Sequence, residues 1–305
     1  MRSPPARQRT CPPARLRRRL PVALALALAL VLPGHAAWSR PPPTAPLTLH
    51  TYPGGPIYDY RWKVLELALA HTRANERDTR LEPYPEDVTQ DRGQQLLEAG
   101  AIDVIALGTN ASREAHMLPI RIDILRGMVG YRLLVIRASD QARIAAMSDR
   151  DMRERLSYGL NTQWADLPVM RAAGYTVETT TSYENLFSML ADRRFDAFPR
   201  GLNEARIELD ARRARYPGLA VEQTRALYFP FPIYFWVNRA NVALARRIDR
   251  GMRLALADGS MREMFQRYYA TEIAMMKKDR RHVIRLDNPT LPSGTPAVDT
   301  SWWWQ

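Results

Sequence analysis

Cysteine and histidine are scarce in this sequence, and both shortages exclude classes of protein. Cys11 is the only cysteine among 305 residues, so the chain cannot form an internal disulfide. The five histidines are scattered without the spacing of a zinc site, and we expect no metal and no cofactor. The fold must therefore be stabilised by an ordinary hydrophobic core, which a chain of this length can supply.

Short catalytic motifs are absent as well. The sequence has no Gly-x-Ser-x-Gly elbow and no glycine-rich phosphate loop. Carboxylates are plentiful, but no pair of them is marked for acid–base catalysis by its position; examples are Glu82, Glu86, Asp87 and Glu184. We therefore expect a protein that is not an enzyme.

The sequence contains one long apolar run. It extends from Leu20 to Leu32, follows a segment with seven arginines and no acid, and precedes Gly34-His35-Ala36. This is the three-part pattern of a secretory signal peptide, here residues 1–36, cleaved near Ala36 or Ala37. The run is shorter than a membrane span, which needs about 20 apolar residues, so an uncleaved anchor is the less favoured alternative. We expect export to the periplasm.

Loss of the signal peptide changes the meaning of the net charge. Removal of its seven arginines lowers the formal net charge from +12 to +5, because residues 1–36 contain no acid. A chain this moderately basic gives no reason to expect nucleic acid binding. Cys11 would be removed as well, and it precedes the apolar run, so it is not the lipid-bearing cysteine of a lipoprotein.

After a proline-rich spacer at 37–46, the chain alternates short strands and helices. The pattern predicts a strand at 47–52, a helix from Tyr60, a strand at 79–84, a helix ending at Gly100 and an apolar strand at 101–107. Such alternation indicates a mostly parallel sheet covered by helices.

The same order recurs in the second half. Strands and helices are predicted in turn at 155–160, 164–174, 175–180, 183–194 and 195–198. Thr181 and Glu184 have the spacing of a capping box at the start of the second of these helices. The last strand is expected to stop at Pro199, with a helix beginning a few residues later.

This repetition predicts two similar α/β lobes, each a mostly parallel sheet flanked by helices. Long strand-like stretches at 128–137 and 228–239 are interpreted as two crossing strands between the lobes, and C-terminal helices are expected at 244–259 and 260–278. The expected boundaries are 47–137 for the first part of lobe 1, 138–232 for lobe 2, 233–285 for the return to lobe 1, and 286–305 for a tail that contains Trp302-Trp303-Trp304.

Three segments in this order carry a resemblance to a known family: residues 96–120, 191–198 and 244–269. They resemble the extracytoplasmic solute-binding proteins of amino-acid-type (family 3-like) ATP-binding-cassette transporters, which have the type II periplasmic binding fold. The resemblance implies a monomer that closes on a small-molecule ligand between its lobes and delivers it to a membrane permease. The alternatives are a receptor that presents its ligand to a sensory partner and, less favoured, a secreted enzyme on the same fold.

The ligand cleft is predicted at one edge of the sheets. Parallel strands bring their C-terminal ends, and the helix starts that follow, to one edge, where free backbone N–H groups favour anions. The predicted ligand-binding residues are Tyr58, Thr109, Asn110 and Arg113 in lobe 1, and Thr162, Trp164, Arg200 and Asn203 in lobe 2. Core packing of Tyr58 and helix capping by the segment that contains Thr162 and Trp164 are the alternatives.

Two arginines, Arg113 and Arg200, determine the charge expected of the ligand. Arg113 matches the family arginine that binds the ligand carboxylate, since a planar guanidinium can donate two parallel hydrogen bonds; an ion pair is the alternative. The family acid that accepts an α-ammonium group aligns with Gly201 here, and the neighbouring Arg200 reverses the local charge. An anionic ligand is therefore expected, amino-acid-like or another carboxylate. The alternatives are that Glu204 replaces the missing acid, and that Arg200 forms a salt bridge to the next helix.

Overall fold

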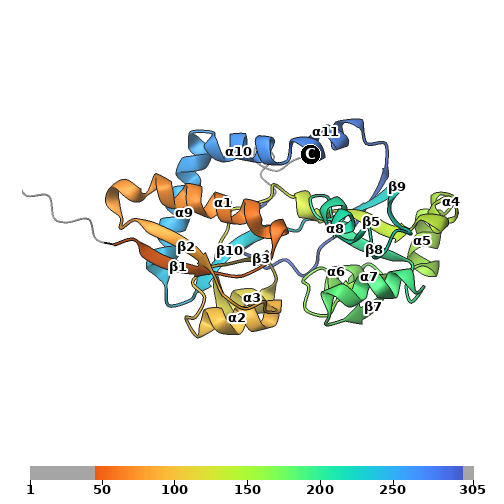
Figure 1. The fold of residues 1–305 in the computed structure, drawn as a ribbon, viewed down its shortest axis with the longest axis horizontal. Helices are drawn as coiled ribbons and strands as arrows, with labels where there is room; N and C mark the ends of the chain where they lie inside the picture. The colour runs from red at the N-terminus through yellow and green to blue at the C-terminus, as the bar shows by residue number, and fades with distance from the viewer. Residues whose placement is uncertain (1–44, 298–305) are drawn as a thin grey trace, which may run out of the picture. The chain divides into compact units, whose positions relative to one another are not determined.

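The computed structural model describes residues 45–297, and the predicted signal peptide, most of the spacer and Trp302-Trp303-Trp304 lie outside the described residues. Within that range the chain forms an α/β structure whose strands divide between two lobes (Figure 1). No helix of the described range is long and apolar enough to cross a lipid bilayer.

Lobe 1 contains two small sheets that are built from both ends of the described chain. Its strands are β1 (Leu47–Thr51), β2 (Thr79–Pro83), β3 (Ile105–Gly108), β4 (Met117–Ile120) and β10 (Ile233–Asn238). β1 pairs in parallel with β2, and β10 lies between β3 and β4, antiparallel to both. The helices of lobe 1 are α1 (Asp59–His71), α2 (Gln90–Glu98), α3 (Ala111–His116), α9 (Val242–Ala257) and α10 (Ser260–Tyr268). α11 (Ala270–Lys278) follows α10 and lies on the lobe 2 side in Figure 1.

Close packing of α9 on α1 fixes the position of the first helix. α1 buries an apolar face that includes Val64, Leu65 and Ala68. A Cβ atom added at Gly251 of α9 would lie 2.0 Å from the carbonyl oxygen of Ala68, so the two helices can approach this closely only with glycine there. This contact holds in place the helix that carries Arg61.

Lobe 2 is built on one six-stranded sheet with the order β11-β9-β5-β8-β6-β7. Its strands are β5 (Tyr131–Arg137), β6 (Ser157–Asn161), β7 (Thr176–Thr180), β8 (Ala197–Gly201), β9 (Leu219–Tyr228) and β11 (His282–Arg285). Its helices are α4 (Gln141–Ala145), α5 (Asp149–Arg155), α6 (Leu167–Ala172), α7 (Tyr183–Ala191) and α8 (Ala205–Arg212). The β6–β7, β6–β8 and β9–β11 pairs are parallel, while β5 is antiparallel to both neighbours.

The lobe boundaries differ from those expected from the sequence. Residues up to Arg137 were assigned to lobe 1, but β5 lies in the middle of the lobe 2 sheet, and all its residues are buried there. Residues 282–285 were also assigned to lobe 1, but they form β11 at the edge of the lobe 2 sheet. The helix expected at 260–278 is divided at Tyr269 into α10 and α11.

Strand β8 does not stop at Pro199, as the sequence predicted, but continues to Gly201. Pro199 is opposite Leu134 of β5, while β6 pairs with β8 only at Ala197. At Pro199 the strand therefore has a paired neighbour on one side, as in an edge strand, where a missing N–H is tolerated. The extension places Arg200 within the sheet.

α7 begins at Tyr183 as predicted, but its N-cap residue differs from the prediction. Ser182, and not Thr181, is the N-cap residue, and its side chain accepts a hydrogen bond from the backbone N–H of Asn185. Glu184 does not close a capping box, because its carboxylate pairs with Arg212 of α8. With Ser182 as the N-cap, the third residue of the helix is Asn185, so Glu184 is not at the capping-box position.

Two crossing segments join the lobes, and a buried carboxylate connects them. Asp123 Oδ1 accepts hydrogen bonds from the N–H groups of Leu125 (3.1 Å) and Ile233 (2.9 Å), and its Oδ2 accepts one from Gly127 (2.6 Å). Leu125 and Gly127 belong to the first crossing, and Ile233 begins β10 after the second. Asp123 therefore ties the two crossings together at the hinge.

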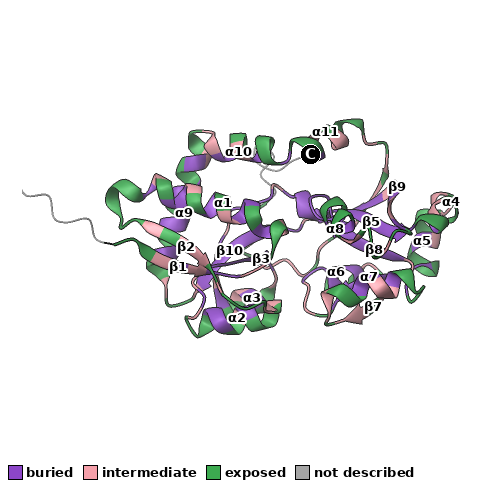
Figure 2. Cartoon of the chain, in the orientation of Figure 1, coloured by how far each residue is buried: buried purple, intermediate pink, exposed green. Residues whose placement is uncertain are grey.

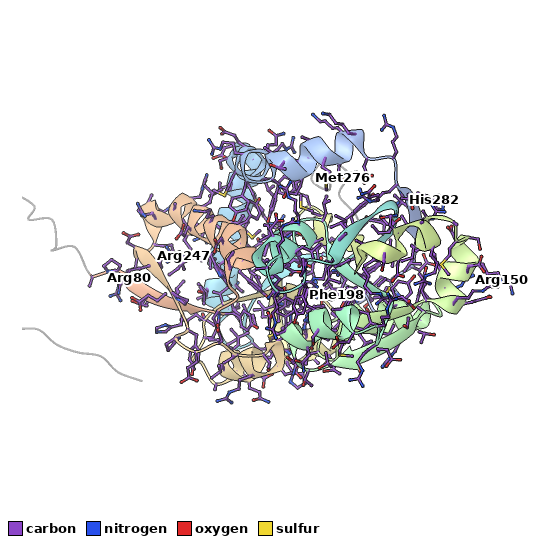
Figure 3. All side chains as sticks on the ribbon, turned by 45° about the vertical axis from the view of Figure 1, so that its right-hand side comes forward. Arg80, Arg150, Phe198, Arg247, Met276 and His282 are labelled. Atoms are coloured by element: carbon purple, nitrogen blue, oxygen red, sulfur yellow. The ribbon has the colours of Figure 1, made fainter. Side chains whose placement is uncertain are left out.

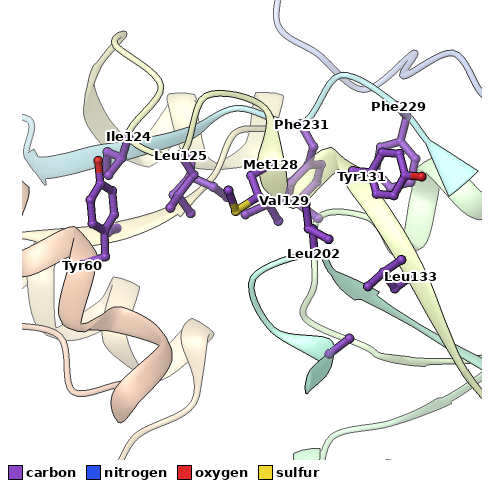
Figure 4. Packing of buried hydrophobic residues seen from close by; sticks show 14 of the residues in the cluster. Tyr60, Ile124, Leu125, Met128, Val129, Tyr131, Leu133, Leu202, Phe229 and Phe231 are labelled. Carbon is purple, nitrogen blue, oxygen red and sulfur yellow. The ribbon is translucent and has the colours of Figure 1, made fainter. Parts of the chain in front are cut away.

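One hydrophobic cluster continues through the crossing from lobe 1 into lobe 2. Figure 4 shows its residues in sequence from Tyr60, past Leu125 and Met128, to Tyr131 and Phe229. Buried residues are concentrated in the strands of both lobes, while exposed residues cover the outer helices (Figure 2). In Figure 3, Phe198 lies among the elements of lobe 2 while Arg80 and Arg150 lie at the periphery.

Candidate functional site

A cavity of about 480 Å³ lies between the two lobes. Among the residues that line it are Tyr58, Arg61, Gln90 and Arg113 from lobe 1, Arg132 from β5, and Asn161, Gln163, Trp164, Asp166, Arg200 and Glu204 from lobe 2. A smaller cavity of about 260 Å³ shares Arg113, Gln163 and Trp164 with it. Both lobes thus contribute polar side chains to a space large enough for a small ligand.

The structure brings most of the predicted ligand-binding residues to these cavities. Four of them line the larger one: Tyr58, Arg113, Trp164 and Arg200. Asn110 and Thr162 line the smaller one. Thr109 and Asn203 line neither, although both are buried and each has a side-chain oxygen without a hydrogen-bond partner among the described residues.

Arg113 is held by neutral groups. Its Nη1 donates to the carbonyl oxygen of Gly108 (2.7 Å), and its Nη2 donates to Gln90 Oε1 (2.6 Å) and to the carbonyl oxygen of Gln163 (3.3 Å). Burial lowers the pKa of Arg113 to about 10, so it still carries its charge at neutral pH. Within residues 45–297, the side-chain hydrogen-bond partners of this buried cation are all neutral, and no carboxylate forms an ion pair with it.

Asn110 orients the helix on which Arg113 lies. It is the N-cap residue of α3, and its Oδ1 accepts a hydrogen bond from the backbone N–H of Arg113 (2.8 Å). The cap satisfies one of the unpaired N–H groups at the start of the helix. Asn110 therefore has a structural role in addition to its place in the smaller cavity.

Arg200 is paired with carboxylates. Its Nε and Nη2 each donate to one oxygen of Glu208 at 2.6 Å, and Nη2 also lies 2.9 Å from Glu204 Oε2. The guanidinium carbon lies 4.5 Å from the ring centroid of Trp164. Burial lowers the pKa of Arg200, but Glu204 and Glu208 outweigh it and hold the pKa well above its usual value. The salt bridge to the next helix is thus formed.

Glu204 is a buried carboxylate surrounded by three arginines. Besides Arg200, it lies 3.8 Å from Arg132 Nη1 and 3.9 Å from Arg61 Nη2, and it accepts a hydrogen bond from the Gly201 N–H (2.9 Å). Burial raises its pKa, but the arginines outweigh burial and hold the pKa below its usual value. The Arg61–Glu204 pair connects lobe 1 to lobe 2.

A third buried carboxylate completes this network. Asp166 Oδ2 lies 3.2 Å from Arg132 Nη2, and only 2% of Asp166 is exposed. Arg61 Nη1 donates to the carbonyl oxygen of Ala106 (2.8 Å). Three buried atoms of the network have no hydrogen-bond partner among the described residues: Arg61 Nε, Arg132 Nε and Asp166 Oδ1.

Sequence reasoning missed Arg61, Arg132 and Asp166. Arg132 interrupts the apolar stretch that became β5, which is a usable signal, because a charged residue in a buried strand requires a partner. Arg61 lies between two aromatic residues on α1, and Asp166 precedes α6, and neither position has a comparable signal. In the described part of the chain, no group of His, Cys, Asp and Glu residues could hold a metal ion.

Comparison with solved structures identifies the fold. No protein-family model matches the chain, and no curated protein sequence matches it significantly. An ancestral arginine-binding protein bound to arginine is similar with a TM-score of 0.56 and 13% identity, over 74% of this chain and 99% of that one. The periplasmic VFT2 domain of Bordetella pertussis BvgS is similar with a TM-score of 0.53 and 18% identity, over 72% of this chain and 92% of that one.

A third similar structure is the GluR0 ligand-binding core in complex with L-glutamate, with a TM-score of 0.53 and 13% identity, over 73% of this chain and 98% of that one. At these identities the similarity concerns the fold alone. It confirms the predicted two-lobed α/β fold of the type II periplasmic binding proteins.

Proposed function

We propose that this protein is an extracytoplasmic solute-binding protein that closes its lobes around a small ligand with an anionic group. The observation that carries the proposal is Arg113, a buried cation at the cavity between the lobes whose hydrogen-bond partners are neutral. A buried charge without a counter-charge is costly, and an anionic ligand would supply that counter-charge. The guanidinium would donate to the ligand acid group in place of a neutral acceptor.

Closure follows from contacts that the ligand makes with both lobes. Arg113 on α3 already reaches the carbonyl oxygen of Gln163 in lobe 2, and Tyr58 and Trp164 line the cavity from opposite lobes. A ligand between these groups contacts all of them only when the lobes are closed. It stabilises the closed state by its differential affinity for the two states.

The signal-peptide pattern and the similar folds support a role outside the cytoplasm. One neighbour is described as a periplasmic domain, and another as the substrate-binding protein of an amino acid ABC transporter. We extend this to uptake: the closed protein would deliver its ligand to a membrane permease of the ABC type. A sensory partner would recognise the same closed state and is the alternative partner.

A thermal-shift screen followed by calorimetry tests the proposal. The chain from Ala37 is mixed with amino acids, monocarboxylates, dicarboxylates and small peptides, and a ligand of the folded state raises the melting temperature. We expect an acidic compound to bind, and Arg113→Gln to weaken that binding by on the order of 100-fold, because a charge-assisted contact is lost. Arg113→Lys is the matched control and should lose less, since it keeps the charge but not the planar donor pair.

Two results would contradict the proposal. One is that no compound of the panel stabilises a well-folded protein. The other is that an acidic ligand binds Arg113→Gln as tightly as it binds the wild type.

A further inference from the structure

We infer that the cavity selects a ligand of net charge −1 that carries, besides its one acid group, an uncharged hydrogen-bonding group such as a primary amide or a hydroxyl. This inference rests on the proposed function, because it takes the cavity between the lobes as the ligand site. It names the class of ligand from the charges and unpaired atoms that the cavity contains.

The net charge follows from the buried ion pairs. Three of the buried arginines, at 61, 132 and 200, form ion pairs with three buried carboxylates, at 166, 204 and 208. These six charges balance each other. Arg113 is the fourth buried arginine at the cavity, and it has neutral partners. Among the buried groups one positive charge is left over, because Asp87, the other carboxylate at the cavity, is exposed and forms no ion pair with Arg113. One negative charge on the ligand neutralises it.

The balanced network also excludes two other ligand classes. A second carboxylate would lie near Glu204 and Asp166 without an additional cation, which is unfavourable in a buried site. An α-ammonium group would need a free acid, but Glu204 is 2.9 Å from Arg200, and Asp166 is 3.2 Å from Arg132. Dianions and zwitterionic amino acids should therefore bind less well than a simple monoanion.

The uncharged group follows from the three atoms without hydrogen-bond partners. Arg61 Nε and Arg132 Nε are donors, and Asp166 Oδ1 is an acceptor. All three residues line the cavity and are at most 4% exposed. They belong to one network, because Arg61 and Arg132 both lie within 3.9 Å of Glu204, and Arg132 lies 3.2 Å from Asp166.

An amide or a hydroxyl matches this set of atoms. Each offers an acceptor to a guanidinium and a donor to a carboxylate, whereas a carboxylate only accepts and an ammonium only donates. A ligand with an apolar end would leave all three atoms unpaired in a buried site, which lowers affinity. The inferred ligand is therefore a monocarboxylate with a neutral polar end.

Calorimetry with matched acids tests the inference. The probes are half-amides, dicarboxylates and unsubstituted monocarboxylates with chains of four to six carbons, so that succinamate is compared with succinate and butyrate at one length. For the chain length that fits, we expect the half-amide to bind about 10- to 100-fold more tightly than either relative. All three should bind Arg113→Gln more weakly.

A charge-altering variant gives a second measurement. Asp166→Asn removes one negative charge from the network and should shift the preference toward the dicarboxylate by about tenfold. Asp192→Asn removes an exposed carboxylate of lobe 2 that lines neither cavity and serves as the matched control, with little expected change in preference.

The results separate the inference from the proposed function. Binding of these acids that depends on Arg113, but with the dicarboxylate or the apolar acid as tight as the half-amide, would overturn the inference and leave the function standing. The same holds if the panel yields a zwitterionic amino acid or a dianion as the tight ligand. If no acid binds, either from the thermal-shift panel or from the matched series, the inference and the proposed function are both wrong.

Discussion

Arg113 and Arg200 occupy comparable places in the two lobes, and their surroundings are opposite. Each lies near the end of a buried strand, β3 or β8, and each is at most 3% exposed at the wall of the same cavity. Arg113 donates to two carbonyl oxygens and one amide oxygen, whereas Arg200 donates to two oxygens of Glu208 and pairs with Glu204. The same side chain thus has neutral partners in one lobe and is neutralised by carboxylates in the other.

The helices that follow explain the difference. In lobe 2, Glu204 and Glu208 are one helical turn apart at the start of α8, so both reach back to Arg200. In lobe 1, Glu114 follows Arg113 directly, but its carboxylate pairs with Arg121 at 2.6 Å. A carboxylate nearby in the sequence is therefore not sufficient; its direction decides which cation it neutralises.

The largest expected effect on stability comes from replacing Arg200, the arginine that carboxylates neutralise. Arg200→Met leaves Glu208 and Glu204 buried with one partner fewer, and it should lower the free energy of unfolding by about 3–5 kcal/mol. Arg113→Met leaves no carboxylate behind, and it should change the free energy of unfolding much less. Urea unfolding of both variants measures the contrast. Equal losses would show that Arg113 is as structural as Arg200.

A double variant checks that the lost pair is the cause. In Arg200→Met with Glu208→Leu, the orphaned carboxylate is removed as well, and a substantial part of the stability should return, because an apolar pair can replace a buried ion pair. If the double variant is less stable than Arg200→Met, Glu208 has another stabilising role.

Asp123 extends the comparison to buried carboxylates. Glu204, among arginines, has a lowered pKa, whereas burial raises the pKa of Asp123 to about 6, despite its three backbone hydrogen bonds and the nearby Arg61. The folded state therefore binds the Asp123 proton more tightly than the unfolded state, whose pKa is near 3.8. This contribution to stability must rise as the pH falls through 6 toward 4.

Asp123→Asn isolates this effect at the hinge. The free energy of unfolding of the wild type, minus that of the variant, should increase by about 2 kcal/mol from about pH 7.5 to about pH 4.5. Denaturant unfolding at a series of pH values measures it, and taking the difference removes the titration of other groups. A difference that does not change with pH would mean that Asp123 titrates outside this window.

The contrast between the arginines also shows which features of the fold and the site can be predicted from the sequence. The order of strands and helices, and the arrival of Arg113 and Arg200 at one cavity, follow from local periodicity and from the shared edge of parallel strands. The sequence left open whether Arg200 binds a ligand or a salt bridge. That choice depends on the rotamer of Glu208 and the distance across one helical turn, which no sequence pattern specifies.

The residues that were missed are those whose partners come from distant segments. Arg61 on α1 meets Glu204, and Arg132 on β5 meets both Glu204 and Asp166, across separations of many residues. Such pairs depend on the tertiary packing, in which β10 returns to lobe 1 and α9 approaches α1 at Gly251. The lobe boundary at β5 was misplaced for the same reason, since a buried apolar strand fits the sheet of either lobe by its sequence alone.

The smallest expected effect concerns Asn110, which was predicted as a ligand contact and is found as the cap beneath Arg113. Asn110→Ala should lower the free energy of unfolding by about 1 kcal/mol and weaken ligand binding by less than about tenfold, because it loosens the helix without removing the cation. Asn110→Ser keeps a capping oxygen and should restore most of both. Urea unfolding and calorimetry on the two variants distinguish the roles. If Asn110→Ser caps the helix normally but still loses as much affinity as Arg113→Gln, then Asn110 contacts the ligand directly, and lobe 1 holds its anion with two side chains.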